Sequence, residues 1–237
     1  YSNNTTATLG NYVWRDANLN GQQDAGEPGL SNITVRVYDL GTNVVGTTTT
    51  DTNGVYTFAS VADGSYFVGF TAPTGYVFTV ATNGPAATDS DVLGTNGFTA
   101  AFALVGGTTN LTVDAGLFDA MPGVRLVLTA GGVADGVTLV TNTGSDVTYR
   151  YQVINTGNTY LVSLSVTDSV LGVIGAISGP LAPGATNELT GIVSNLVADV
   201  TNTGMVVALP AYSNGTVIAG LASLTNTDDA VVDIVSP

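Results

Sequence analysis

Acidic and amide side chains recur at regular spacing in the segment DANLNGQQDAGE, residues 16–27. With Asp16 as the first position, the third, fifth, sixth, ninth and twelfth positions are Asn18, Asn20, Gly21, Asp24 and Glu27. These are the residue types and spacing of the calcium-loop pattern D-x-[DN]-x-[DN]-G-x5-E. Because calcium is a hard cation that prefers oxygen ligands, alternating side chains of a tight loop can surround one ion. The sequence therefore predicts a calcium site here.

Each position of the predicted loop has an expected role. The side-chain oxygens come from Asp16, Asn18, Asn20 and Asp24, the last directly or through water. Gln22 offers its backbone carbonyl, and Glu27 closes the shell with two carboxylate oxygens. Gly21 permits the sharp turn between the two halves. The alternative is an ordinary solvated loop, since turns rich in Asn and Gly favour the same residue types.

The elements that must position this loop are strands. The segment NYVW precedes it and ITVRV follows it, whereas two helices flank the loop in an EF-hand and their opening carries the signal. We therefore expect the ion to hold strands in place and not to operate a switch.

The composition removes several classes of function. The chain of 237 residues has a formal net charge of −14 and lacks Cys, His and Lys, so its cations are the four arginines Arg15, Arg36, Arg125 and Arg150. Without these residues there is no usual catalytic triad, no zinc site of the usual ligands and no Lys-Asn isopeptide crosslink. So acidic a chain is a poor partner for nucleic acid, and oxygen-liganded cations are its natural counterions.

The chain reads as short strands separated by turn residues. In ITVRVYD, residues 33–39, apolar and polar residues alternate, which indicates one buried and one solvated face. The segment DAMPG, residues 119–123, interrupts this pattern, and a new one begins with VRLVLTA. The sequence thus predicts an all-β fold of two tandem β-sandwich domains: an extended N-terminal arm over residues 1–8, a first sandwich over 9–119 and a second over 120–237.

No apolar run is long enough to span a bilayer, and Tyr1 begins a polar segment and not a signal peptide. These features predict a mature or trimmed product without a membrane span.

The segments GNYVWRDANLNGQQDAGEPGLSNITVRVYD, TTTTDTNGVYTFASVADGSYFVGFTAPTGY, TDSDV and VDAGLF lie between Gly10 and Phe118. Together they resemble the calcium-binding B-type repeat domain of serine-aspartate repeat bacterial surface proteins, within the wider collagen-adhesin B superfamily. The resemblance implies a prealbumin-like β-sandwich that binds calcium and serves as a rigid spacer on the bacterial cell surface. It also implies weaker calcium sites at Asp89 and Asp91, helped by Asp51 and Asn53. The alternative role for each is to cap a turn.

The second half contains VTYRYQVINTGNTYLVSLSVTDSVLG, GPLAPGATNELTG and LTNTDDAVVDIVSP. It resembles the Asn-Thr-Gly immunoglobulin-like repeat found in tandem on large bacterial surface proteins. That resemblance implies a structural role and brings no catalytic residues.

Other groups of residues that could carry chemistry also have simpler structural roles. The acid pairs Asp228/Asp229 and Asp89/Asp91 match a glycosidase dyad in residue type but not in sequence context. We therefore expect no enzymatic activity, and we expect Asp228 and Asp229 to lie in a solvated turn. Trp14 is expected in the core and not on a sugar-binding surface. Sequons begin at Asn3, Asn4, Asn32, Asn110 and Asn214, where chance accounts for most of them in a chain so rich in Asn and Thr.

These observations predict a non-enzymatic, extracellular structural subunit of a bacterial surface stalk, layer or filament, stiffened by calcium. We expect self-association into a homopolymer, in which the N-terminal arm pairs with an exposed sheet edge of a neighbour, such as the C-terminal strand AVVDIVSP. The alternative function is an adhesin that presents a site for a glycan or host-surface ligand.

Overall fold

The computed structural model describes residues 5–81 and 84–236, and these residues form strands and turns without a helix. The all-β prediction is confirmed. The chain divides into two compact units, Tyr1–Ala120 (unit 1) and Met121–Pro237 (unit 2), so the division lies one residue after the predicted boundary. In the part of the chain that the structure describes, no helix is long and apolar enough to cross a membrane.

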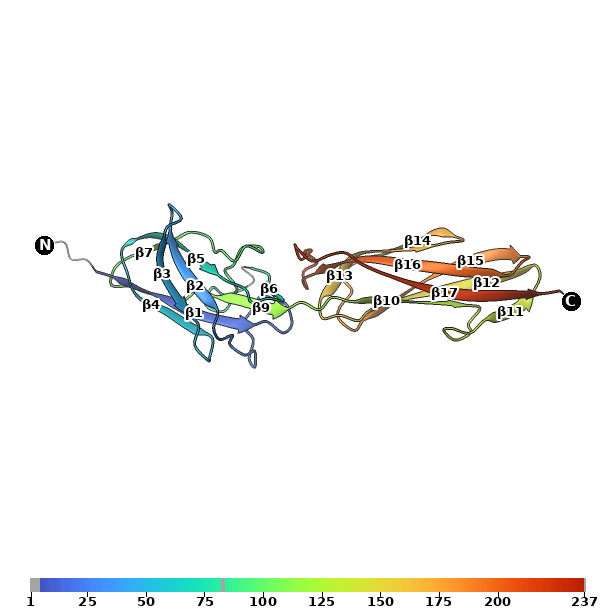
Figure 1. The fold of residues 1–237 in the computed structure, drawn as a ribbon, viewed down its shortest axis with the longest axis horizontal. Coiled ribbons are helices and arrows are strands. Elements are labelled where there is room, and N and C mark those ends of the chain that lie inside the picture. Colours follow the sequence, from blue (N-terminus) through green and yellow to red (C-terminus); the bar gives the residue numbers. More distant parts are fainter. Residues whose placement is uncertain (1–4, 82–83, 237) are drawn as a thin grey trace. The chain divides into compact units, whose positions relative to one another are not determined.

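Unit 1 is a sandwich of two sheets (Figure 1). One sheet has the order β4-β1-β9-β6, with β8 also paired to β1, and the other has the order β3-β2-β5-β7. The strands are β1 (Ala7–Arg15), β2 (Thr34–Asp39), β3 (Val44–Thr49), β4 (Val55–Val61), β5 (Gly64–Phe70), β6 (Tyr76–Phe78), β7 (Phe102–Leu104), β8 (Thr109–Asn110) and β9 (Ala115–Asp119).

The core of unit 1 lies between these sheets and follows the predicted alternation. In β2, Val35 and Val37 are fully buried, while Arg36 and Tyr38 point to the other face. β1 occupies the centre of its sheet, antiparallel to β4 and parallel to β9. Trp14 at the end of β1 is fully buried, as expected for a core aromatic.

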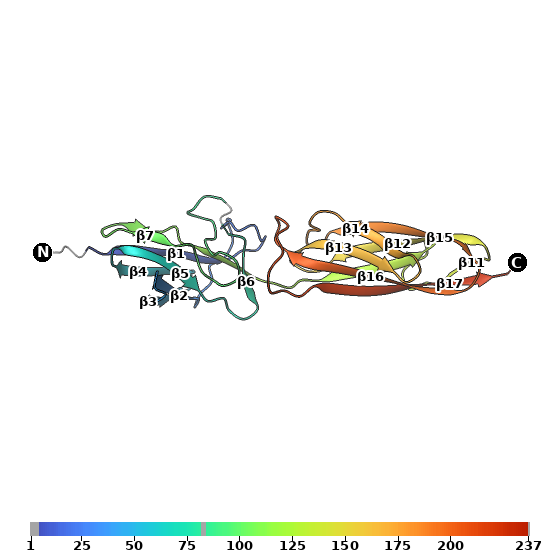
Figure 2. The same cartoon turned by 90° about the horizontal axis from the view of Figure 1, so that it is seen from above.

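Unit 2 is a second sandwich, built from the sheets β10-β12-β15 and β11-β17-β16-β13-β14. Its strands are β10 (Val124–Ala130), β11 (Leu139–Asn142), β12 (Ser145–Asn155), β13 (Tyr160–Asp168), β14 (Gly172–Ile177), β15 (Thr186–Leu196), β16 (Val200–Ala211) and β17 (Leu224–Val235). Figure 2 shows the long strands running lengthwise through the unit. Alternating residues of both sheets meet in one apolar core.

The predicted N-terminal arm is shorter than residues 1–8. Ala7 and Thr8 belong to β1, and Ala7 is fully buried opposite Val61 of β4. The carbonyl of Thr6 accepts a hydrogen bond from the amide of Gly107 at 3.0 Å, so this residue is also attached to unit 1. Residues 1–4 lie outside the described residues.

β17 pairs with β16 over residues 224–232 and with β11 over residues 232–235. The C-terminal strand is therefore partly paired within its own sheet, and its pairing with the arm of a neighbour stays a prediction. One expectation about unit 2 is wrong. Asp228 and Asp229 lie in the middle of β17 and not in a turn, and the Asp228 carboxylate accepts the amide hydrogen of Leu128 on β10 at 2.7 Å. Adjacent residues of a strand point to opposite faces, so Asp229 is exposed whereas Asp228 is half-buried and accepts the amide of a neighbouring strand, and a pair of acids alone does not distinguish this arrangement from a turn.

Candidate metal site

The predicted loop begins where β1 ends, and its first residue is enclosed by donors. Asp16 is fully buried. Its Oδ1 accepts the amide hydrogen of Leu19 at 2.7 Å, and its Oδ2 accepts that of Gly21 at 2.8 Å. The hydroxyl of Thr79, which follows β6, also donates to Oδ2. A buried carboxylate thus joins the end of β1, the turn of the loop and the end of β6.

The side chains of the third, fifth and ninth loop positions meet at one point. The amide groups of Asn18 and Asn20 both donate to Oδ2 of Asp24, each at 2.8 Å. The side-chain oxygens of the two asparagines accept backbone amides two residues ahead, at 3.1 Å and 2.7 Å. Residues separated along the loop therefore point their polar ends toward one another.

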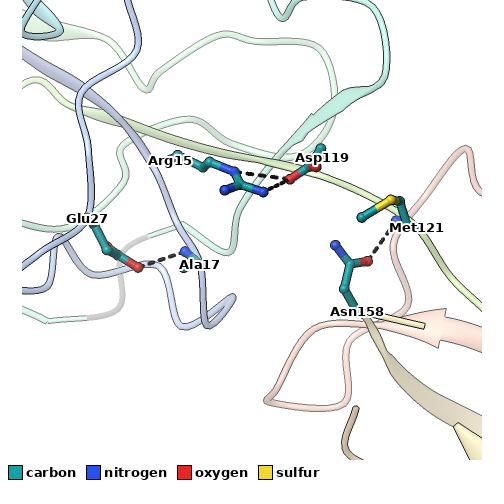
Figure 3. Close-up of polar contacts among 6 residues, drawn as sticks. All are labelled: Arg15, Ala17, Glu27, Asp119, Met121 and Asn158. Atoms are coloured by element: carbon teal, nitrogen blue, oxygen red, sulfur yellow. Dashed lines mark hydrogen bonds and ion pairs between the residues drawn. The ribbon is translucent and has the colours of Figure 1, made fainter. Parts of the chain in front are cut away.

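Glu27 closes the loop on itself. Its Oε1 accepts the amide hydrogen of Ala17 at 2.7 Å (Figure 3), and its Oε2 accepts that of Asp24 at 3.0 Å. Burial raises the pKa of the Glu27 carboxyl, these two hydrogen bonds oppose that rise, and the nearby charges of Asp16 and Asp24 add to it. The last carboxylate of the loop is therefore held where negative charge is already concentrated.

The turn of the loop rests against a neighbouring segment. Gly21 has a φ of +78°, and a Cβ added there would lie 2.2 Å from the carbonyl oxygen of Val80, so only glycine fits. The carbonyl of Gly21 accepts the amide of Ser90 at 3.1 Å, and Gln22 forms an isolated antiparallel bridge with Asp89. The segment containing Asp89 and Asp91 thus packs directly on the predicted calcium loop.

The acidic side chains of the loop would not be sufficient to hold a calcium ion by themselves. Within residues 5–81 and 84–236, no three His, Cys, Asp or Glu side chains form a group that could hold an ion. Calcium also accepts amide oxygens as ligands; Asn18 and Asn20 carry such oxygens, but their amide nitrogens point to Asp24 and their oxygens accept backbone amides of the loop. The residues present fit calcium as oxygen donors, provided that the two amide groups turn their oxygens toward the ion.

A second acidic group lies beside the loop, and it includes one residue that the sequence analysis missed. Oδ2 of Asp91 accepts the amide hydrogen of Asp114 at 2.7 Å, and Oδ1 of Asp114 accepts that of Tyr12 at 3.1 Å. Asp89 and Asp114 are buried, with exposed fractions of 4% and 0%. Oδ1 of Asp89 and Oδ2 of Asp114 each lack a hydrogen-bond partner among the described residues.

These carboxyl groups are protonated more readily than ordinary aspartates. Burial raises the pKa of Asp114 to about 8, and the negative charges of Asp91 and Asp89 add to this rise. Burial likewise raises the pKa of Asp91 to about 6 and also raises that of Asp89. Buried oxygens without donors and raised acid pKa values both mean that this group lacks compensating positive charge.

Asp51 and Asn53, predicted to help Asp89 and Asp91, lie in the turn between β3 and β4. Oδ1 of Asp51 accepts the amide hydrogens of Asn53 at 2.8 Å and Val55 at 2.9 Å. Within the described parts of the chain, neither Asp51 nor Asn53 forms a hydrogen bond with Asp89 or Asp91. The geometry is that of the alternative role, an aspartate that caps a turn.

The sequons differ in accessibility. Asn32 and Asn214 are exposed, whereas Asn110 is half-buried and its Oδ1 accepts hydrogen bonds from the amide and hydroxyl of Thr112. Asn3 and Asn4 lie outside the described residues.

Polar contacts also fix the last strand of unit 1 and the first residues of unit 2 (Figure 3). Arg15 at the end of β1 forms an ion pair with Asp119 of β9, with Nη2 and Oδ1 2.6 Å apart. In unit 2, the amide of Met121 donates to Oδ1 of Asn158 at 2.7 Å.

Comparison with known proteins shows what the first unit is similar to. Residues 7–117 match the family model of the SdrD B-like domain. The chain is similar to serine-aspartate repeat-containing protein F of Staphylococcus epidermidis, with 42% identity over 114 residues, which are 48% of this chain and 6% of that protein. It is equally similar to serine-aspartate repeat-containing protein D of Staphylococcus aureus strain Newman, with 42% identity over 111 residues, 46% of this chain and 8% of that protein.

These matches confirm the predicted resemblance for the first half of the chain. They cover less than a tenth of the length of the curated relatives, so they describe one domain and not the activity of a whole protein.

Among solved structures, the chain is similar to BcpA, the major pilin subunit of Bacillus cereus, with 12% identity and a TM-score of 0.39 over 96% of this chain and 69% of that chain. It is also similar to a D295N mutant of the shaft pilin SpaA of Lactobacillus rhamnosus GG, with 11% identity and a TM-score of 0.32 over 97% of this chain and 98% of that chain.

Proposed function

We propose that this chain is a non-enzymatic structural module of an extracellular bacterial surface protein, and that calcium stiffens its first unit. The match of residues 7–117 to the SdrD B-like domain supports the general role. The observation that carries the calcium proposal is the closed network of residues 16–27, in which carboxylates and amides spaced along the loop converge. Asp16, Asn18, Asn20, Gln22, Asp24 and Glu27 would hold the ion.

A cation in this loop would act on strands and not on a substrate. Asp16 contacts both the loop and Thr79, and Gly21 contacts Ser90, so the loop connects three segments of unit 1. Calcium supplies positive charge to carboxylates that otherwise repel one another. Because the unfolded chain does not gather these oxygens, calcium binds the folded unit and stabilises it.

Thermal unfolding in calcium and in chelator tests the proposal. At a calcium concentration about a hundredfold above the dissociation constant, one site contributes roughly 2.7 kcal/mol to the stability of unit 1. We expect the unit 1 transition to move to a clearly higher temperature in calcium and the unit 2 transition to stay unchanged. Coincident melting curves in calcium and in chelator would contradict the proposal.

Two substitutions locate the site. Glu27→Gln removes a charge from the closing carboxylate, so we expect it to abolish most of the calcium-dependent shift. Asp228→Asn makes the same change of charge in unit 2 and keeps an oxygen acceptor for Leu128, so the shift should persist. If both variants respond equally to calcium, the loop is not the site.

A second, weaker calcium site is part of the same proposal: binding of the ion would draw together Asp89, Asp91 and Asp114, whose carboxylates do not form a three-ligand group in the arrangement of the described residues. The oxygens without partners on Asp89 and Asp114 support it. Asp91→Asn should reduce the number of calcium ions bound in a calorimetric titration while the binding to the main loop remains. An unchanged stoichiometry would remove this second site and leave the first intact.

We also propose that the module associates with copies of itself through sheet edges. β15 forms one edge of the first sheet of unit 2 and β14 forms one edge of the second, and Val173 of β14 is 80% exposed. Unpaired strand edges can accept an added strand. Sedimentation velocity with and without residues 1–5 tests the role of the N-terminal segment, because this deletion leaves β1 whole. Monomers in both samples at high concentration with calcium would contradict self-association.

A further inference from the structure

The outer face of the sheet β3-β2-β5-β7 carries an arginine and a group of aromatic rings. Arg36 and Tyr38 of β2 lie opposite Gly69 and Phe67 of β5. Residues that are directly opposite in an antiparallel pair share one face of the sheet, and the buried residues Val35 and Val37 take the core face. Arg36 and Tyr38 are therefore on the solvent side.

The rings on this face form a compact group. Tyr38 stacks on Phe67 with ring centroids 5.1 Å apart and planes 7° from parallel. Phe98, from the loop before β7, meets both rings edge to face, with centroid distances of 5.7 Å to Tyr38 and 5.6 Å to Phe67. Phe98 reaches across Gly69, where an added Cβ would lie 2.7 Å from its ring. The missing side chain at position 69 makes the space in which the ring lies.

An open groove of about 350 Å³ runs beside these rings. Its lining includes Arg36, Tyr38, Gly69, Thr71, Asn96 and Phe98. Oδ1 of Asn96 accepts the amide hydrogen of Phe98 at 3.2 Å, which leaves its side-chain amide hydrogens available to a ligand. The groove therefore combines apolar ring surface with hydrogen-bond donors, and it lies within the usual range of about 300–1,000 Å³ for small-ligand sites.

Arg36 differs from the other arginines. Arg15, Arg125 and Arg150 each form an ion pair, with Asp119, Asp135 and Glu188 respectively. Arg36 makes no such pair with any residue in the described ranges. The chain has 18 acidic residues and only four basic ones. Because Arg36 lines a groove and forms no ion pair within the described residues, its positive charge is available to an anionic ligand.

We propose that this groove binds a carboxylated sugar, namely a pyranose ring that bears one carboxylate. The planar guanidinium of Arg36 matches a carboxylate in two parallel hydrogen bonds. The exposed parts of Phe98 and Tyr38 offer an apolar surface to the ring, and Asn96 and Thr71 offer partners for its hydroxyl groups. The net charge of −14 opposes long polyanions, so the site selects a single acidic sugar unit and not a highly charged chain.

This site is independent of the calcium proposal, because the residues that line the groove and those of the calcium loop do not overlap. Its test is a titration followed by amide signals in nitrogen-edited NMR spectra of the full chain, with three probes: methyl β-D-glucuronide, methyl β-D-glucoside and acetate. We expect saturable shifts at Gly69, Thr71 and Asn96 with the glucuronide, and at least about tenfold weaker binding of the neutral glucoside and of acetate.

Substitutions assign the binding to named groups. Arg36→Gln should reduce glucuronide affinity to that of the neutral glucoside, and Phe98→Ala should reduce the affinity for both sugars. Arg125→Gln makes the same change of charge on the surface of unit 2 and should leave binding unchanged. The spectra of the variants without ligand show whether each one is folded.

Several outcomes would overturn the proposal. Acetate binding as tightly as the glucuronide would mean that the groove recognises charge alone, and equal binding of both sugars would remove the role of Arg36. Absence of shifts at these amides with all three probes would rule out the site. Shifts that follow protein concentration without sugar would instead assign the groove to contact with a second copy of the chain.

Discussion

Unit 1 and unit 2 both bury aspartates, but they surround them differently. In unit 2, Asp168 accepts hydrogen bonds from the hydroxyl of Tyr151 and the amide group of Asn202, and also from the backbone amides of Val170 and Leu171. In unit 1, Asp89 and Asp114 are at least as deeply buried, yet each keeps an oxygen without a partner in the part of the chain described.

The difference shows two ways to stabilise a sandwich domain around buried negative charge. Unit 2 supplies the donors for Asp168 from two strands and from the turn after β13, so this carboxylate is hydrogen-bonded without an ion. Unit 1 leaves carboxylate oxygens unsatisfied, and an unsatisfied buried group costs about 1–3 kcal/mol. A bound cation would offset that cost, so the two units should respond differently to the same solution conditions.

The largest effect is expected from Asp168→Ala. It removes an acceptor shared by four donors and leaves the buried side chains of Tyr151 and Asn202 without it, so unit 2 should lose about 3 kcal/mol of stability. Denaturant unfolding in calcium and in chelator should give the same loss in both. Asp229→Ala, on the exposed side of β17, is the matched control and should change stability little. If the stability lost by Asp168→Ala depended on calcium, the two units would not differ in their need for an ion.

Asp114→Asn should stabilise unit 1, whereas Asp168→Ala destabilises unit 2. The amide keeps an oxygen for the Tyr12 amide but removes the negative charge of a buried carboxylate whose Oδ2 has no donor among the described residues. In chelator at pH 9, where Asp114 would be ionised, we expect unit 1 to gain about 1 kcal/mol, which raises its melting temperature by several degrees. In calcium the gain should disappear. A variant that is less stable than the original chain in chelator would show that the Asp114 charge is already compensated.

The pH dependence of unit 1 follows from the same carboxyl group. The pKa of Asp114 is raised from 3.8 to about 8, so the folded unit holds a proton that the unfolded chain releases within this range. Stability in chelator should therefore fall as the pH rises from about 4 to 8, because the folded state binds more protons than the unfolded state. Scanning calorimetry at several pH values measures this slope. A unit 1 that became more stable over the range would contradict the assignment.

The smallest change in stability is expected from substitutions of Asp228, which lies beside the edge of β10. Asp228 and Asn226 accept the amide hydrogens of Leu128 and Leu126, at 2.7 Å and 2.8 Å. Asp228→Ala removes one acceptor and should cost unit 2 about 1 kcal/mol, whereas Asp228→Asn should cost almost nothing. Equal stabilities of the two variants in urea would mean that water replaces the lost acceptor.

Local patterns were sufficient to predict the fold class and the segment that forms the loop. Alternation in β2 indicated its buried face, and the spacing from Asp16 to Glu27 indicated which side chains converge. Both depend on residues close in sequence, where strand and turn geometry fix relative positions.

The missed features depend on contacts between distant residues. Asp114 lies against Tyr12, and Thr79 donates to Asp16 across 63 positions of sequence. A charged residue in the apolar run TVDAGLF was the available signal for Asp114. Nothing in the order of residues indicated that β17 lies between β11 and β16, because strand order within a sheet is a property of the whole fold.

The parallel pairing of β1 with β9 determines how unit 1 would bear a pulling force. β1 enters the unit from the N-terminal side and β9 leaves it toward the C-terminal side, with Val13, Trp14 and Arg15 aligned to Ala115, Gly116 and Leu117. A pull on the two ends therefore drives these strands past each other along their length, and the hydrogen bonds between them are loaded together and not one after another. The ion pair of Arg15 with Asp119 lies across the same two strands. Rupture of unit 1 would then require the simultaneous loss of these contacts, which gives the domain mechanical resistance along the direction of the chain.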